Sequence, residues 1–302
     1  MTIKDAAALL RSGGVVAFPT ETVYGLGANA LDAAAVQRIY DLKGRPSTSP
    51  LIVHVSSIEM ARELVTEWPP LADQLARQWW PGPLTFVLPK KAVIPNIVTA
   101  GLATVGIRIP AHPVALELIQ EAGVPLAAPS ANKFTGISPT TAQHVEAAFG
   151  SQVPVIDGGS CQVGIESTVV AIENGRLTLL RPGMVTLGDL EVITAQSGEA
   201  HAAPGMHHRH YSPRTPLLLV DYVDQLPDNS GAYVWHRHPA VTERHVKLAN
   251  DPGQYASQLY ATLHLLDYEK WPWIAVEMPH NTPEWAAVRD RLSRAQSSFY
   301  QK

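Results

Sequence analysis

Short apolar runs that resemble buried strands alternate with helix-like patterns through the first 195 residues. The strand-like runs occupy 15–18 (VVAF), 51–55 (LIVHV), 84–88 (LTFVL), 105–109 (VGIRI), 125–130, 153–156, 167–172 and 177–181. Helical spacing covers 32–42, 57–66, 70–79, 112–121 and 140–148. This alternation is typical of an α/β domain, and several runs follow one another closely enough to pair antiparallel. We therefore expect one domain over 1–195, built on a mixed sheet.

The pattern breaks off over 196–214 and starts again beyond it. The intervening segment has no apolar periodicity and is expected to be a linker. Strand-like runs recur at 217–220, 232–235 and 273–278, with helical patterns over 253–269 and 284–298. In the first of these two helices an apolar stripe recurs at helical spacing, formed by Tyr255, Leu259, Leu263 and Leu266. Residues 215–302 are therefore expected to form a second, small α/β domain.

The composition and charge of the chain exclude several classes of protein. The chain has 302 residues, of which 46% are hydrophobic and 17% charged, enough to fill two cores. No apolar run approaches the roughly 20 residues of a membrane span, and the N-terminus lacks a signal-peptide core, so we expect a cytoplasmic protein. The net charge of −4 argues against a basic footprint for duplex nucleic acid. Cys161 is the only cysteine, which excludes an internal disulfide and a cysteine-based zinc cluster.

The most informative stretch of the chain is 41–54, DLKGRPSTSPLIVH. Lys43 and Arg45 are separated by one glycine, so both cations can reach the same anion. Arginine binds phosphate as a planar fork and lysine as a point charge, which suits a polyphosphate better than a single carboxylate. Ser49 and the hydroxyls before it add neutral donors. A solvated turn with two surface cations is the alternative, and this loop by itself leaves both open.

Further polar groups follow the predicted strands. The chain contains no G-x-x-x-x-G-K-[ST] sequence, so a P-loop is excluded, and the strand before G25-L-G27 is poor for a dinucleotide fingerprint. Phosphates would then be held by dispersed cations, for which Arg108, Arg181 and the linker residue Arg209 are candidates. Hydroxyls and amides for ligand binding come from Thr20, Thr22, Ser130, Asn132, Thr135 and Ser138. Surface ion pairs and an ordinary Ser/Asn turn are the alternative explanations.

The linker sequence H207-H-R-H210 raises the question of a metal, because imidazoles at this spacing can ligate zinc. No cysteine lies near it, and a flexible linker rarely holds a closed tetrahedral site. Polar contacts with an anion are the preferred interpretation.

Eight motifs in this order carry a resemblance to a known family: FPTETVYGLG, KGRPSTSPLIVH, PGPLTFVL, VGIRIP, APSAN with SPT, GIESTVV, LLRPG and PGMHHRHYSP. Together they resemble the YrdC-type threonylcarbamoyl-AMP synthases, in the long form with a C-terminal domain. The resemblance implies a YrdC-like twisted mixed sheet with an open cleft, followed by a small Rossmann-like domain. It also implies a reaction, in which L-threonine, bicarbonate and ATP give L-threonylcarbamoyladenylate and pyrophosphate. The product serves formation of N6-threonylcarbamoyladenosine at position 37 of tRNAs that read ANN codons.

The resemblance also implies roles for single residues. Threonine binding falls to Thr22, His54, Arg108, the backbone of Ala128, and Ser167, with Arg108 facing the carboxylate. ATP binding falls to Lys43, Arg45, Ser49, Thr104, Ser130, Asn132, Ser138, Arg181 and the linker residue Tyr211, with Lys43 and Arg45 as the catalytic pair. Mg²⁺ is implied as the companion of ATP, without metal ligands from protein side chains. The implied partner is the tRNA threonylcarbamoyl transferase machinery, with tRNA itself at most weakly bound.

Two other functions compete with this one. A non-enzymatic module that binds double-stranded RNA or the ribosome has been proposed for related single domains, but the acidic first 200 residues argue against it. Carbamoyl transfer in hydrogenase maturation uses a related domain inside a longer chain. The sequence lacks the acylphosphatase and CxxC zinc modules that would flank it there.

Overall fold

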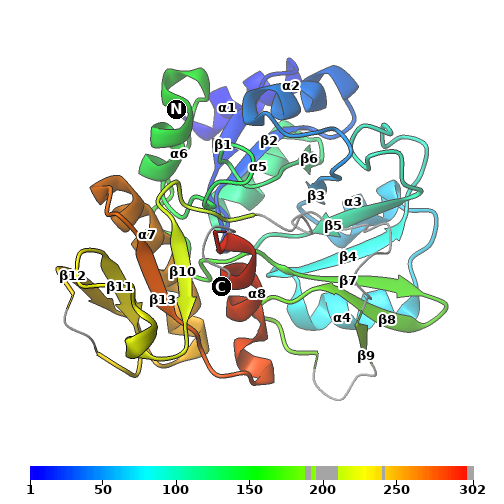
Figure 1. Ribbon diagram of the computed structural model, residues 1–302. Helices are drawn as coiled ribbons and strands as arrows, with labels where there is room; N and C mark the ends of the chain where they lie inside the picture. The colour runs from blue at the N-terminus through cyan, green and yellow to red at the C-terminus, as the bar shows by residue number, and fades with distance from the viewer. Residues whose placement is uncertain (188–191, 195–209, 240–241, 298–302) are drawn as a thin grey trace.

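The computed structural model describes residues 1–187, 192–194, 210–239 and 242–297. Within them, a mixed sheet of nine strands runs in the order β1-β2-β6-β3-β5-β4-β7-β8-β9 (Figure 1). Its strands are β1 (Val16–Phe18), β2 (Gly25–Asn29), β3 (Ile52–His54), β4 (Leu84–Pro89), β5 (Thr104–Arg108), β6 (Leu126–Ala127), β7 (Thr168–Glu173), β8 (Arg176–Arg181) and β9 (Val192–Thr194). The pairs β3/β5, β4/β7 and β8/β9 are parallel and the others antiparallel, so the predicted mixed α/β sheet is confirmed.

Helices cover this sheet on two faces. They are α1 (Ile3–Arg11), α2 (Ala33–Lys43), α3 (Ile58–Leu64), α4 (Pro70–Trp79), α5 (Pro113–Ala122) and α6 (Ala142–Phe149), the last followed by the 3-10 turn η1 (Gly150–Gln152). Successive residues of a strand face opposite sides. In β1, Val16 and Phe18 therefore pack on α1 and α5, whereas Ala17 joins the larger core with α2, α3 and α4.

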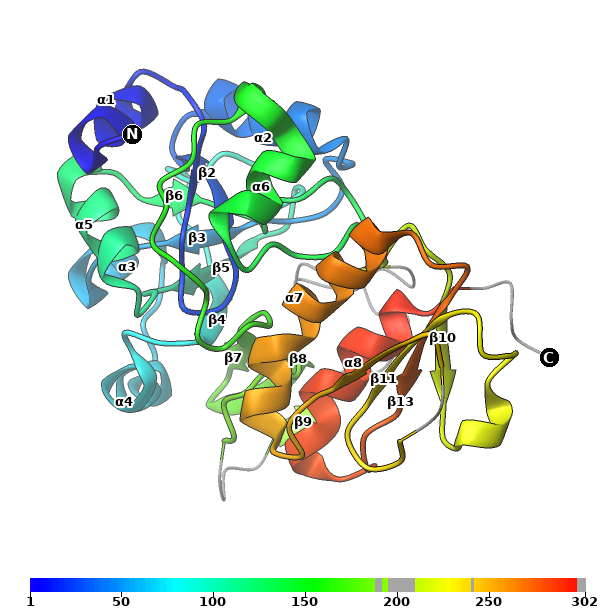
Figure 2. The same cartoon turned by 90° about the vertical axis from the view of Figure 1, so that its left-hand side faces the viewer.

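The same alternation leaves a polar patch on one face of the sheet centre. Val53 of β3 and Ile107 of β5 enter the larger core. Their neighbours His54 and Arg108 face the other way, toward the side where α1 and α5 lie. A ligand pocket can form there because these helices cover only the part of that face nearest β1 and β6 (Figure 2).

A second sheet of four strands, all parallel, lies beyond the predicted linker. In the order β10-β13-β11-β12, it consists of β10 (Leu217–Val220), β13 (Ile274–Glu277), β11 (Ala232–Trp235) and β12 (Arg244–Lys247). Helices α7 (Pro252–Glu269) and α8 (Ala286–Ala295) pack on it, and the short turns η2 (Val223–Gln225) and η3 (Pro283–Trp285) complete the unit. The predicted α7 stripe is confirmed, since Tyr255, Leu259, Leu263 and Leu266 are all fully buried.

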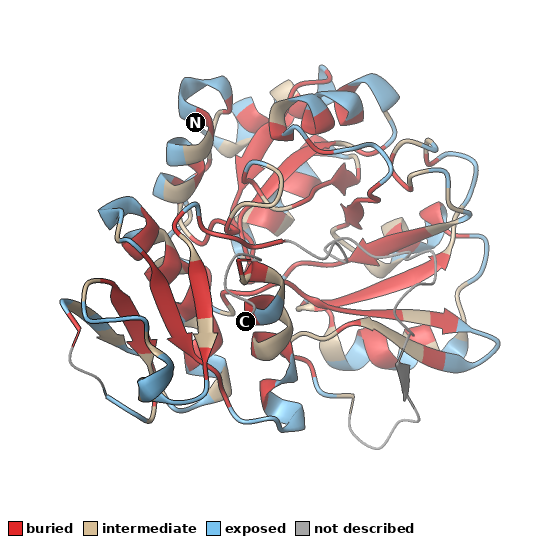
Figure 3. Cartoon of the chain, viewed as in Figure 1, coloured by how far each residue is buried: buried red, intermediate tan, exposed pale blue. Residues whose placement is uncertain are grey.

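The two sheets share a packed boundary made by α7 and α8. Figure 1 shows α8 between the smaller sheet and strands β7 and β8, and Figure 2 shows α6 beside one end of α7. His144 of α6 stacks on His264 of α7, with ring centroids 3.9 Å apart. Strands of both sheets are mostly buried, while exposure concentrates on outer helix faces and loops (Figure 3). Among the described helices, each is too short or too polar to cross a membrane.

Several local predictions need correction or stay open. The predicted strand over 153–156 is wrong, because Val155 makes only a single bridge to Ala17. Strands β2, β9 and β12 were not predicted. Residues 25–29 are glycine-rich, and 244–247 (RHVK) contain a single apolar residue. Residues 196–209 of the predicted linker lie outside the described residues, so the domain limits 1–195, 196–214 and 215–302 stay predictions.

Candidate active site

The directions of the strands place several polar residues together at one edge of the nine-stranded sheet. β3 and β5 are parallel, and their last residues, His54 and Arg108, are register partners. β4 is antiparallel to β5 and parallel to β7, so both β4 and β7 begin at this edge. Ser167 immediately precedes β7, and Arg181 ends the antiparallel strand β8. Four residues from distant parts of the sequence therefore meet at one place.

The glycine between the two cations of the K-G-R sequence is a helix cap. Asp32 begins α2 by accepting hydrogen bonds from the backbone N–H groups of Ala34 and Ala35. Gly44 ends the helix in the left-handed conformation, with φ of 64°. Lys43 is thus the last helical residue, and Arg45 starts the loop that returns toward β3. Because Gly44 lies between them at the helix end, the side chains of Lys43 and Arg45 point in different directions and do not lie side by side.

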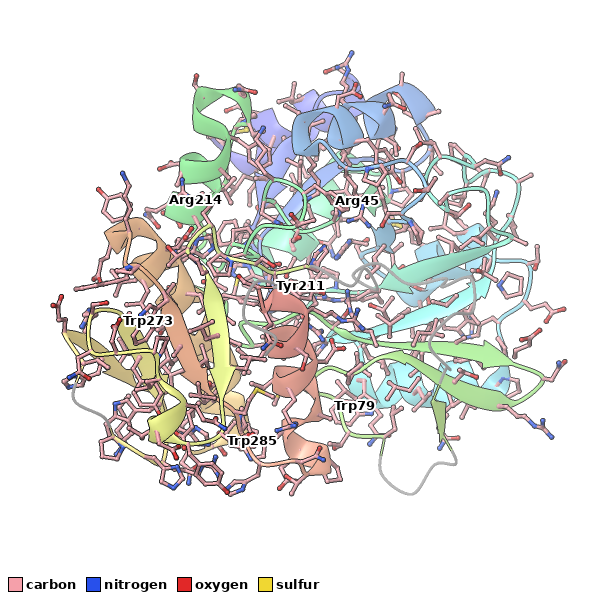
Figure 4. All side chains as sticks on the ribbon, in the orientation of Figure 1. Arg45, Trp79, Tyr211, Arg214, Trp273 and Trp285 are labelled. Carbon is pink, nitrogen blue, oxygen red and sulfur yellow. The ribbon has the colours of Figure 1, made fainter. Side chains whose placement is uncertain are left out.

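A pocket at this edge has about 540 Å³ of space that no protein atom fills, part of it open to solvent. It is lined by Thr20, Thr22, Val23, Gly25, Arg45, Ile52, His54, Arg108, Ala128, Pro129, Ser130, Glu166, Ser167, Arg181, His210 and Tyr211. Most of the side chains predicted for substrate binding are therefore brought together in one cavity. Figure 4 shows Arg45 and Tyr211 in the interior of the molecule, with Tyr211 beside the end of α8.

One end of the pocket is organised around Arg108. Its Nη1 donates to Oγ1 of Thr22 at 3.0 Å, and its Nη2 lies 2.7 Å from Oε2 of Glu21. Burial lowers the pKa of the neighbouring His54 to about 3, and the charge of Arg108 adds to this effect. His54 is therefore a neutral imidazole that can exchange hydrogen bonds without adding charge. A single guanidinium with free space beside it suits a carboxylate ligand.

The other end of the pocket is cationic. Nη2 of Arg45 donates to Oγ of Ser49 and to the backbone oxygen of Pro50, the latter at 3.0 Å. Arg181 donates to Ser167 twice, from Nε to the backbone oxygen and from Nη2 to Oγ, both at 3.1 Å. Burial lowers the pKa of Arg45 to about 10 and also lowers that of Arg181, yet both remain charged at neutral pH. Two buried guanidinium groups that line one pocket suit a phosphorylated ligand.

Several unsatisfied polar atoms lie at this pocket, and others lie in the unit of the smaller sheet, on Trp235, His236, Arg237, Tyr255 and Trp273. Among the described residues, buried atoms without a hydrogen-bond partner include Glu21 Oε1, His54 Nδ1, Arg108 Nε, His210 Nδ1 and the hydroxyl of Tyr211. Buried polar groups in folded proteins are nearly always paired, and the exceptions need an explanation. Four of these five groups line the pocket and the fifth, Glu21, holds Arg108. A polar ligand that supplies the missing partners is that explanation.

Five of the predicted residues do not line the pocket. Lys43 is buried behind it, where Nζ donates to the backbone oxygens of Ser130 and Asn132 at 2.7 and 2.6 Å. Burial is also the main reason that the pKa of Lys43 lies well below its ordinary value. Ser49 contacts Arg45, as described above. Asn132 accepts at Oδ1 from Oγ of Ser130 at 2.5 Å. These residues hydrogen-bond to the pocket-lining residues Ser130 and Arg45 and so support the pocket from behind.

Ser138 and Thr104 are placed differently. Oγ of Ser138 donates to Oε1 of Glu166 at 2.5 Å, so it supports a pocket residue from behind. Thr104 is the first residue of β5 and pairs with Pro89, the last residue of β4, at the edge of the sheet opposite Arg108. The structure therefore does not bring Thr104 to the pocket.

Two carboxylates at the pocket, Glu21 and Glu166, were absent from the predicted site, whereas His210, which lines the pocket, comes from the segment predicted to contact an anion. Glu166 stands in the GIESTVV motif directly before Ser167, and Glu21 stands between two predicted hydroxyl residues, so their positions were visible in the sequence. Their charge partners were not, because Arg108 and Arg291 come from other elements. His210 belongs to the H207-H-R-H210 sequence, of which His207, His208 and Arg209 lie outside the described residues.

The pocket offers no dedicated cage for a metal ion. No cluster of three or more His, Cys, Asp or Glu side chains suited to a metal occurs among the residues described. Both carboxylates at the pocket are engaged, Glu21 with Arg108 and Glu166 with Arg291. Because Mg²⁺ binds through few protein carboxylates together with phosphates and water, the site fits an ion that arrives on a ligand's phosphates.

Two family models match the chain. Residues 8–183 match the Sua5/YciO/YrdC family, described as telomere recombination, and residues 176–297 match the C-terminal domain of threonylcarbamoyl-AMP synthase. The first match contains the nine-stranded sheet up to β8, and the second contains the four-stranded sheet with α7 and α8.

Known proteins match over nearly the full length. The threonylcarbamoyl-AMP synthase of Bacillus subtilis is 39% identical over 97% of this chain and 92% of its own length. That of Pyrococcus abyssi is 46% identical over 72% of this chain and 68% of its own length. The crystal structure of Pyrococcus abyssi Sua5 complexed with L-threonine superposes with a TM-score of 0.90 at 38% identity, covering 97% of this chain and 93% of that one. The chain therefore belongs to the threonylcarbamoyl-AMP synthase family, in the long form that carries the C-terminal domain.

Proposed function

We propose that the protein is a threonylcarbamoyl-AMP synthase, which converts L-threonine, bicarbonate and ATP into L-threonylcarbamoyladenylate, pyrophosphate and water. Family membership over nearly the whole chain supports this reaction. The observation that carries it here is that Arg108, Arg45 and Arg181 line one pocket, with Arg108 on β5 three strands away from Arg181 on β8. Such separated guanidinium groups suit the carboxylate of a small amino acid and a triphosphate.

The pocket residues around Arg108 would act by holding threonine in one orientation. Arg108, held by Glu21 and Thr22, receives the threonine carboxylate, while the neutral His54 and Ser167 offer hydrogen-bonding groups to the rest of the molecule. Oγ of Ser167 is itself fixed by Oγ1 of Thr85 at 2.8 Å and by Arg181 at 3.1 Å. Holding the amine of threonine in one position favours attack on the nucleotide by its carbamate, which the amine forms with bicarbonate as water is released.

The cationic end would stabilise charge. A carbamate oxygen attacks the α-phosphorus, the bond to the β-phosphate oxygen breaks, and pyrophosphate leaves with the electron pair. This step needs in-line positioning and neutralisation of phosphate charge, and no protein nucleophile. Arg45 and Arg181 are placed for that task, and Lys43 reaches it if ATP draws Nζ from the backbone oxygens it now contacts. Mg²⁺, held by the phosphates and water, would neutralise part of the same charge.

We further propose how the product is used, and with which partner. The adenylate serves N6-threonylcarbamoyladenosine formation at position 37 of tRNAs that read ANN codons. Because this anhydride hydrolyses readily, a transferase that delivers the threonylcarbamoyl group to tRNA is the expected partner, in the cytoplasm.

The decisive experiment is pyrophosphate release by the purified protein, with each substrate omitted in turn. We expect release only when ATP, L-threonine and bicarbonate are all present, together with a threonylcarbamoyl-AMP mass in the products. ATP turnover that is equally fast without threonine would contradict the proposal. RNA binding that weakens with salt and proceeds without ATP consumption would instead support the RNA-binding module.

A further inference from the structure

Glu166 brings a negative charge into a pocket that otherwise gathers cations. It lines the same cavity as Arg45 and Arg181, and its side chain is only 9% exposed. In a partly buried site, like charges repel across several ångströms. A triphosphate would therefore be repelled by this carboxylate unless another group neutralised it. This step rests on the proposed function, because it takes ATP as the ligand.

The counter-charge comes from α8, on the smaller sheet. Nε of Arg291 donates to Oε2 of Glu166 at 2.7 Å, and Nη2 donates to the backbone oxygen of Glu166 at 3.3 Å. Burial raises the pKa of Glu166, but the charges of Arg291 and Arg181 outweigh it and hold the pKa below its ordinary value. The side chain of Arg291 has no exposed surface. Glu166 is thus an ionised carboxylate paired across the boundary between the two sheets.

The other contacts of Glu166 come from the same boundary. The hydroxyl of Tyr260, on α7, donates to Oε2 at 3.1 Å, and Oγ of Ser138 donates to Oε1 at 2.5 Å. With Arg291, these groups give both carboxylate oxygens of Glu166 a hydrogen-bond partner. Two of its three side-chain partners belong to the helices of the smaller sheet.

Arg291 also supports one wall of the pocket. Its guanidinium carbon lies 5.3 Å from the ring centroid of Tyr211, which in turn stacks on Tyr260 at 5.8 Å. Tyr211 is held in a left-handed conformation with φ of 61°, a strained state for a residue other than glycine. The contacts with Arg291 and Tyr260 are what hold the ring against the pocket.

We propose that Arg291 is a positioning residue of the ATP site, supplied by the C-terminal domain, which neutralises Glu166 and supports Tyr211. The C-terminal domain thereby completes the electrostatics of the catalytic pocket. ATP affinity depends on this contact, whereas threonine affinity does not, because Arg108 and its partners lie at the other end of the cavity.

The test compares Arg291→Met with the charge-matched double variant Glu166→Gln/Arg291→Met. Calorimetry measures ATP and threonine affinity separately, and pyrophosphate release gives the KM for ATP. We expect Arg291→Met to weaken ATP binding about 30-fold, with threonine affinity within about threefold of the wild type. The double variant, which lacks the repelling charge, should recover ATP binding to within about fivefold. Arg291 also pairs with Asp290 at 2.7 Å, and Arg294 shares that carboxylate. The matched control is therefore Arg289→Met, because Arg289 lies on the same helix and donates to the backbone oxygen of Pro279.

Each other outcome counts against the inference. Wild-type ATP affinity in Arg291→Met, or a double variant no better than the single one, would overturn it, and the latter would reduce Arg291 to a purely structural contact. If Arg291→Met does not fold, Arg291→Lys, which keeps the charge, must bind ATP more tightly than Arg291→Gln in the same assay. A wild-type protein without threonine-dependent pyrophosphate release would overturn the proposed function and this inference with it. An active wild type beside an unaffected Arg291→Met would overturn the inference alone.

Discussion

Arg108 and Glu21 form an ion pair inside the pocket, with Nη2 and Oε2 2.7 Å apart and side chains only 3% and 7% exposed. Oε2 of Glu21 also accepts a hydrogen bond from the backbone N–H of Ala111 at 3.0 Å. The carboxylate therefore anchors Arg108 to the loop that follows β5. Nε of Arg108 and Oε1 of Glu21 remain unpaired among the described residues. The pair is arranged to hold a third group.

The first prediction concerns threonine binding. Arg108→Gln in a Glu21→Gln background removes the guanidinium without leaving a buried carboxylate unpaired. Because a buried charged hydrogen bond to the ligand is lost, we expect threonine affinity to fall about 100-fold, while ATP affinity changes by less than about threefold. Calorimetry measures both. Glu21→Gln alone is the matched control and should keep threonine binding, since Arg108 remains. If the double variant bound threonine as tightly as the wild type, Arg108 would not be the residue that binds the threonine carboxylate.

The second prediction concerns turnover. Arg45→Ala removes one of the two guanidinium groups at the cationic end, and the loss of one such group typically lowers the rate by about 100-fold or more. Threonine affinity should stay within about threefold of the wild type, because Arg45 lies away from Arg108. Pyrophosphate release and threonine calorimetry check the two effects. Arg45→Lys is expected to recover only part of the rate, since lysine keeps the charge but lacks the planar fork. A wild-type rate in Arg45→Ala would show that Arg45 does not act on the phosphates.

The third prediction concerns pH and the contact between α6 and α7. His144 and His264 stack at 3.9 Å, and burial lowers the pKa of each ring to about 4. In the unfolded chain both rings take up protons near pH 6.5, so between about pH 6.5 and 4 the unfolded state binds more protons. The free energy of unfolding should therefore fall as the pH drops through this window.

Denaturant unfolding at pH 7.5 and pH 5 checks this effect. Other buried histidines titrate in the same direction, so the comparison is with His144→Gln/His264→Gln. We expect the double variant to lose about 1–2 kcal/mol less stability on acidification than the wild type, a figure that allows for solvent screening of the partly exposed rings. Equal losses in the two proteins would show that the stack does not sense pH.

The fourth prediction concerns the loop that carries Glu166. Gly164 has φ of +78°, and a Cβ placed there would lie 2.4 Å from Cα of Ser257 on α7. Gly164→Ala should therefore combine backbone strain of about 1–2 kcal/mol with an overpacking cost of about 1–3 kcal/mol. Gly175→Ala is the matched control, because Gly175 has a similar φ of +73° but open space around it. Denaturant unfolding should show the larger loss for Gly164→Ala, and equal losses would mean that the loop and α7 do not pack closely.

Much of the site was predictable because its residue types are tied to local structure. Apolar runs before His54, Arg108 and Arg181 predicted strands, and their polar ends predicted a ligand site. Whether those strand ends lie close together depends on the directions of the strands, which the sequence of a single apolar run does not show. Parallel pairing of β3 with β5 brings His54 to Arg108, whereas the same strand places Thr104 at the far edge.

Most of the element types, the two apolar cores and the motif order that marks the family follow from the sequence alone, because they depend on residue spacing and on contacts between near neighbours. Which carboxylate each arginine neutralises depends on tertiary packing. Glu166 and Arg291 are 125 residues apart, and a charge inside a protein has no fixed effect until its partner and its burial are known. Tertiary packing therefore brings these two charges together as an ion pair at the pocket.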